Sequence, residues 1–143
     1  MKINIAFSSY EKKDFDCPEE TGNLELNTKN RNDAIKAEHI QYGPMNPADE
    51  KYWDRAAAHW NTTPEVAKQS RCGNCAAFDV SPQMKKCLPG PVSEGTEESE
   101  GQLGYCWMHH FKCHSARVCY TWAAGGPISK DEISAEWQGK NKQ

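Results

Sequence analysis

The sequence predicts a small, irregular α+β domain, with short helices and a few short strands and turns held together by cysteine chemistry. Two observations lead to this prediction. Leu, Ile, Val and Phe number only 18 among 143 residues, so aliphatic side chains are too few for a large core. The chain instead carries five Trp, five Tyr and seven Cys. An aromatic core with a cysteine-based staple is therefore expected.

The first third of the chain is predicted to be an N-terminal extension, residues 1–45, preceding the main domain, residues 46–143. The stretch KINIAF (2–7) alternates in polarity and predicts an edge strand. NDAIKAEHI (32–40) predicts a short helix that ends before Gly43. Cys17, within this extension, lies far along the chain from the other six cysteines.

The main domain begins with a helical part, residues 46–70. In NPADEKYWDRAAAHWN, Asn46 is the expected cap and Pro47 the first helical residue. A second short helix is expected to start at Pro64, capped by Thr63. The first of these helices has one apolar stripe at i, i+3, i+4 and i+7, which predicts a face packed in the core: Trp53, Ala56, Ala57 and Trp60.

A cysteine-rich part, residues 71–127, follows the helices, and a C-terminal helix is predicted over residues 129–138. Between Cys87 and Cys106 the Pro, Gly and Glu residues of LPGPVSEGTEESEGQLG predict a loop. The C-terminal helix has a capping box of Ser129 and Glu132. Ile133 and Trp137 are its expected anchors to the core.

The Cys-x-x-Cys of Cys72 and Cys75 is compatible with four chemistries: a redox dithiol, a zinc site, an iron–sulfur site or part of a disulfide framework. A thioredoxin-like dithiol needs a preceding strand, whereas the residues before Cys72 are predicted to be helical. No signal peptide is apparent in MKINIAFSSYEKK, so a cytoplasmic location with free thiols is expected. Metal chemistry is favoured over the dithiol and the disulfides.

A zinc site would combine Cys72 and Cys75 with two further donors. Both CWMH (106–109) and HFKC (110–113) have donor types at the required spacing of two residues. The candidates are Cys106, His109, His110, Cys113, His114 and Cys119. A structural, zinc-stapled binding module with no redox role is therefore the alternative function.

Three segments, CGNCAAF (72–78), GYCWMHHF (104–111) and ARVCYTW (116–122), resemble the high-potential iron–sulfur proteins. That family carries a Cys-x-x-Cys followed by an aromatic, a third Cys after a glycine, and a fourth about a dozen residues later. The resemblance implies an irregular fold around a metal cluster and one-electron transfer with a redox partner protein. It implies four 4Fe–4S ligands, Cys72, Cys75, Cys106 and Cys119. It also implies an aromatic shell drawn from Phe78, Tyr105, Trp107, Phe111, Tyr120 and Trp122.

The sequence departs from the family pattern at two points. Thirty residues separate Cys75 from Cys106, and they include Cys87; Cys113 is an additional thiol between the third and fourth proposed ligands. Cys87 and Cys113 are therefore alternatives to Cys106 as the third ligand. His110, beside Cys113 in the HFKC segment, is a further alternative ligand that would replace a cysteine at one iron.

Charge and motifs narrow the remaining function classes. A net charge of −3 and a pI near 5.9 give no general footprint for nucleic acid. No apolar run approaches the roughly 20 residues of a membrane span. No nucleophile elbow, phosphate-binding loop or zinc-protease helix is present, so we expect a carrier and not an enzyme.

Overall fold

Three short antiparallel strands form the centre of the protein. We describe residues 15–43, 49–88 and 101–141 of a computed structural model. The strands are β1 (Phe78–Asp79), β2 (Leu103–Cys106) and β3 (Phe111–His114), in the order β1-β2-β3. With the short helices around them, they confirm the predicted small, irregular α+β fold. The strand expected over residues 2–7 and most of the acidic loop lie outside the described residues.

The register of the sheet gives it two different faces. Cys106 pairs with Phe78 on one side and Phe111 on the other, and Gly104 pairs with Cys113. Side chains directly opposite each other share a face, and neighbours along a strand alternate between faces. These residues therefore line one face, the thiol face, whereas Tyr105 and its partners Asp79 and Lys112 belong to the other.

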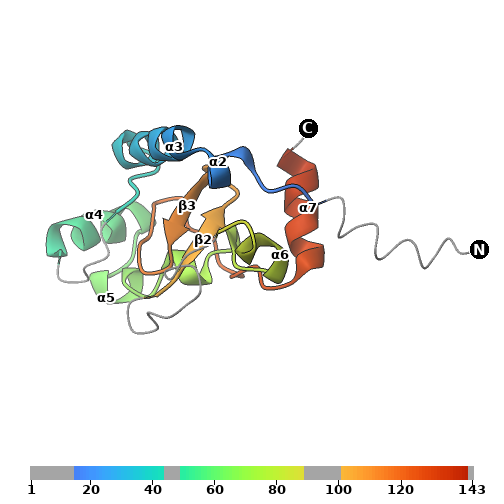
Figure 1. Ribbon diagram of the computed structural model, residues 1–143. Helices are drawn as coiled ribbons and strands as arrows, with labels where there is room; N and C mark the ends of the chain where they lie inside the picture. The colour runs from blue at the N-terminus through green and yellow to red at the C-terminus, as the bar shows by residue number, and fades with distance from the viewer. Residues whose placement is uncertain (1–14, 44–48, 89–100, 142–143) are drawn as a thin grey trace, which may run out of the picture.

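The N-terminal helices α2 (Glu19–Gly22) and α3 (Leu24–Lys36) pack against β3, above the sheet in Figure 1. Asn27 Oδ1 accepts a hydrogen bond of 2.7 Å from the backbone N–H of Lys112. Asn30 Nδ2 donates one of the same length to the carbonyl of His110. The described part of the predicted extension, residues 15–43, is thus attached to the sheet by side-chain hydrogen bonds.

Helices α4 (Glu50–Trp60) and α5 (Pro64–Ala67) lie at one end of the sheet (Figure 1). The predicted stripe is confirmed, since Trp53, Ala56 and Ala57 are buried and Trp60 packs against them. The start of α4 differs from the expectation: Asp49 is the cap, its carboxylate accepting from the N–H of Tyr52. The expected cap, residue 46, lies outside the described residues. Capping of α5 by Thr63 is confirmed.

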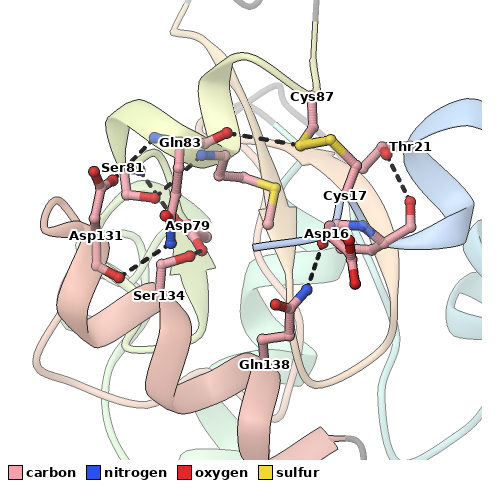
Figure 2. Close-up of a disulfide and its surroundings, with 12 residues drawn as sticks. Asp16, Cys17, Thr21, Asp79, Ser81, Gln83, Cys87, Asp131, Ser134 and Gln138 are labelled. Atoms are coloured by element: carbon pink, nitrogen blue, oxygen red, sulfur yellow. Dashed lines mark hydrogen bonds between the residues drawn. A yellow bond between two sulfur atoms is a disulfide. The ribbon is translucent and has the colours of Figure 1, made fainter. Parts of the chain in front are cut away.

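Helices α6 (Pro82–Lys85) and α7 (Asp131–Asn141) lie at the other end (Figure 1). The fully buried Asp79 carboxylate accepts hydrogen bonds from Trp107 Nε1 (2.8 Å) and Ser134 Oγ (2.5 Å), and its other oxygen accepts from the N–H of Ser81 (2.9 Å). This network joins the sheet to both helices, and Figure 2 shows Asp79 between Ser81 and Ser134.

The C-terminal helix differs from its prediction in start and anchoring. It begins at Asp131, and the carbonyl of Lys130 accepts the first helical N–H groups, so Ser129 lies one residue before the cap. Trp137 packs against the core as predicted, but Ile133 is exposed. Ser134 is buried in its place, because its hydroxyl binds Asp79.

A disulfide joins Cys17 to Cys87, across 70 residues of sequence (Figure 2). It ties the segment before α2 to the turn after α6. The expectation of free thiols is therefore wrong for this pair. Sequence spacing could not reveal the pair, because the N-terminal segment reaches Cys87 only by packing along the sheet.

Candidate metal centre

Five free cysteines are buried in a single cluster on the thiol face of the sheet. Their side chains are between 2 and 9% exposed. They share this core with few aliphatic residues, as the composition predicts. The five thiols are Cys72, Cys75, Cys106, Cys113 and Cys119.

Cys72 and Cys75 lie at the start and just after the end of a single turn of 3-10 helix, η1 (Cys72–Asn74). The N–H of Cys75 donates to the carbonyl of Cys72 at 2.9 Å, which closes the turn. The N–H of Cys72 donates to the carbonyl of Arg117, at 2.7 Å. The Cys-x-x-Cys turn is thereby attached to the segment that leads to Cys119.

Cys106 ends β2, and the glycine of the GYC motif, Gly104, has a packing role beside it. A Cβ placed on Gly104 would come within 2.5 Å of the ring of Phe78. The absence of a side chain therefore lets the Phe78 ring lie across β2 beside Cys106. The backbone N–H of His109, in the turn after β2, donates to Cys106 Sγ at 3.4 Å.

Cys119 follows the loop between β3 and the C-terminal segment. Its sulfur lies 3.1 Å from Thr121 Oγ1, and that oxygen lies 2.7 Å from His109 Nε2. The next residue, Tyr120, donates its N–H to the carbonyl of Ile40, so the loop is held against the N-terminal segment. Two turns, after β2 and after Cys119, thus meet at the thiols.

Several of these thiols affect one another's protonation. Burial, with smaller contributions from Cys72 and Cys106, raises the pKa of Cys119 to about 12, although hydrogen bonds from Thr121 act in the opposite direction. Burial also raises the pKa values of Cys75 and Cys113, with contributions from the same two neighbours. Cys106 is the exception, because a hydrogen bond from Cys113 lowers its pKa. Without a cation, most of these thiols are therefore protonated at neutral pH.

Backbone amides point toward the sulfurs as well. N–H groups of Ala77 and Ala123 lower the pKa of Cys75, opposing the effect of burial. The amide of His109, with those of its neighbours Met108 and His110, does the same for Cys106. Donors of this kind stabilise thiolate sulfur and orient a ligand for metal.

Of the six aromatics expected around a cluster, Phe78 and Phe111 lie in the same core as the thiols, and Trp122 packs against it. Tyr105 and Trp107 are buried elsewhere, with Met84, Leu88 and Ile128, because they belong to the opposite side of the sheet. Tyr120 packs against the α4 stripe.

Sequence reasoning missed one aromatic in the thiol core, Tyr42. It is buried, and its ring meets that of Phe111 edge-on at 4.8 Å. Its hydroxyl accepts from the N–H of His114 at 3.2 Å. No local pattern marks this tyrosine, which follows α3 in a segment placed only by tertiary packing.

The three alternative ligands, Cys87, Cys113 and His110, differ in where they lie relative to the thiol core. Cys87 is in the disulfide and is not a free thiol, which contradicts its assignment as an alternative ligand. Cys113 lies among the other thiols. His110 has its Nδ1 3.4 Å from the hydroxyl of Tyr105, a residue of the other face of the sheet.

No grouping of metal-binding side chains is found in the described part of the chain. Among residues 15–43, 49–88 and 101–141, no three His, Cys, Asp or Glu side chains are placed so that they could hold a metal ion. A 4Fe–4S cluster would take four thiolates, one on each iron. The buried free thiols of the η1 turn, β2 and the segment after β3 match that requirement in donor type and number.

Comparisons with family models, with curated proteins and with solved structures gave no match. The resemblance to high-potential iron–sulfur proteins therefore depends on the cysteine motifs themselves. In the described part of the chain, no helix is both long enough and apolar enough to cross a bilayer.

Proposed function

We propose that this protein is a one-electron carrier, and not an enzyme, that binds a 4Fe–4S cluster through Cys72, Cys75, Cys106 and Cys119. The observation that carries the proposal is that these four thiols, which come from three separate segments of the sequence, are buried together in one core. The cluster would supply a reversible one-electron couple, with a redox partner protein at the other end of the transfer.

The surroundings of the thiols support a high-potential couple. Reduction potential depends on hydrogen bonds to the sulfurs and on access of water. Phe78, Phe111 and Tyr42 occupy the same core as the thiols and are at most 6% exposed, so they keep water away. Amides directed at Cys75 and Cys106 stabilise negative charge on these sulfurs. Exclusion of water disfavours the most highly charged, reduced states of the cluster, so it favours use of the more oxidised couple, which is the one with the high potential. The amide donors stabilise the reduced state and raise the potential of that couple.

The burial of the thiols also makes metal loading part of folding. Ligation requires thiolates, whereas burial raises the pKa of Cys75 and Cys119. A cation at the sulfurs reverses this preference and releases the thiol protons. The core should therefore be better packed and more stable with its metal bound.

The test is metal and sulfide analysis of the purified protein, followed by EPR. We expect a brown protein with iron and acid-labile sulfide in equal amounts. Its EPR signal should appear after oxidation, as in high-potential centres. A signal seen only after reduction would instead indicate a ferredoxin-like couple.

The outcome that would overturn the proposal is a colourless protein containing zinc and neither iron nor sulfide. That result would establish the zinc-stapled binding module as the function class. Purification under anaerobic conditions serves as the control, because oxygen can destroy a cluster during isolation.

A further inference from the structure

A chain of two hydrogen bonds connects His109 to the sulfur of Cys119. Thr121 Oγ1 stands between them, 2.7 Å from His109 Nε2 and 3.1 Å from Cys119 Sγ. The threonine hydroxyl has a single hydrogen, so it can donate to only one of these two neighbours. The other neighbour must donate to Thr121 if both contacts are hydrogen bonds.

His109 also touches a second proposed ligand through its backbone. Its N–H donates to Cys106 Sγ at 3.4 Å. The turn after β2 therefore reaches both Cys106 and, through Thr121, Cys119. The contact with Thr121 was not apparent from the sequence, because His109 and Thr121 are twelve residues apart and lie on different segments.

Ligation fixes the direction of this chain. A metal-bound Cys119 has no hydrogen on its sulfur and can only accept. The Thr121 hydroxyl must then donate to Cys119 Sγ, and Thr121 Oγ1 must accept from an N–H at His109 Nε2. Both the neutral imidazole in its Nε2–H tautomer and the protonated imidazolium carry a hydrogen on Nε2, so His109 can supply this N–H.

We propose that Thr121, oriented by His109, is a positioning residue that raises the reduction potential of the centre by donating a hydrogen bond to Cys119 Sγ. This inference rests on the proposed function. Reduction adds negative charge to the ligand sulfurs, and a hydrogen bond to a charged acceptor is stronger than one to a neutral acceptor. The donor therefore stabilises the reduced state more than the oxidised state.

Voltammetry of the cluster-loaded protein tests the inference, with Thr121→Val as the variant and Thr121→Ser as its matched control. Valine keeps the branched shape and removes the hydroxyl, whereas serine keeps the hydroxyl. For Thr121→Val we expect the reduced-to-oxidised ratio at a fixed applied potential to fall about tenfold, which is about 59 mV for one electron. Thr121→Ser should remain within about twofold of the wild type.

His109→Leu provides an independent variant, because it removes the imidazole but keeps the backbone N–H that meets Cys106. Its potential should move in the same direction as that of Thr121→Val, by a smaller amount. A Thr121→Val protein with the wild-type potential would overturn the inference.

A further measurement uses the wild-type protein, so it does not require that any variant binds the cluster. Long-range ¹H–¹⁵N spectra of the loaded, reduced protein should show His109 as the tautomer with its hydrogen on Nε2. The Nδ1–H tautomer would contradict the proposed direction of the chain. A wild-type protein without a cluster would reject the proposed function and this inference with it, whereas a loaded protein with an unshifted Thr121→Val potential would reject this inference alone.

Discussion

Cys113 is the fifth thiol in the core, and its replacement tests which cysteines hold the metal. If the four ligands are those proposed, Cys113→Ala should keep the wild-type content of iron and sulfide. The matched variant, Cys106→Ser, replaces a proposed ligand that lies beside Cys113 in the same core. It should lose the cluster. The two variants thus affect neighbouring sulfurs with opposite expected results.

The stability cost of Cys113→Ala can be worked from its position. The side chain is 2% exposed, so removal of its sulfur leaves a small cavity. Loss of one buried heavy atom from a core, as in Ile→Val, costs about 1 kcal/mol. In a domain of this size that corresponds to a fall in Tm of about 3 °C. Cys106→Ser should cost more, because metal binding to a folded site contributes directly to folding.

The assay is iron, sulfide and zinc content per chain, with thermal unfolding of the same samples. Retention of iron by Cys106→Ser together with its loss in Cys113→Ala would refute the assignment and make Cys113 the third ligand. Loss of iron in both variants would show that the centre needs Cys113 as well, and the set of four would be wrong.

Three further predictions concern the rest of the fold. Asp79→Ala should lower the free energy of unfolding, measured in urea, by about 3–6 kcal/mol, because the three groups that donate to the Asp79 carboxylate lose their acceptor. Asp79→Asn retains one side-chain oxygen and should therefore lower it clearly less. Peptide mapping without reductant should find Cys17 and Cys87 in one disulfide-linked peptide. The Cys17→Ser variant should bind as much metal as the wild type, because the disulfide is separate from the core of free thiols. Loss of metal in Cys17→Ser would contradict that separation. In the metal-free, folded protein the pKa of Cys119 is raised to about 12, so the protonated thiol stabilises the folded state. This stabilisation is present in full below about pH 9 and is lost as the pH rises toward 12. Over that range the free energy of unfolding should fall by at most about 1.4 kcal/mol per pH unit. Urea unfolding between pH 8 and 11 measures this slope, and a flat profile would show that the Cys119 thiol is not buried in the metal-free protein.

Local sequence was sufficient for the features that depend on near neighbours. The scarcity of aliphatic residues predicted a small fold with an aromatic and cysteine core, and the core has that composition. The apolar stripe of α4 and the Thr63 cap follow from helical spacing and local hydrogen bonding, and both are confirmed. The cysteine motifs singled out four thiols that the structure brings into one core.

Tertiary structure decided what depends on segments far apart in the chain. The alternation of the sheet places Cys106 and Tyr105 on opposite faces, so proximity to a cysteine in sequence did not predict which aromatics join the thiol core. Tyr42 enters that core, and Cys17 reaches Cys87, only because residues 15–43 pack along the sheet. Contact between Thr121, Cys119 and His109 likewise requires two turns to meet. Sequence spacing restricts where a side chain can point within one turn or strand, whereas the meeting of separate segments is set by how the whole chain buries its few apolar groups.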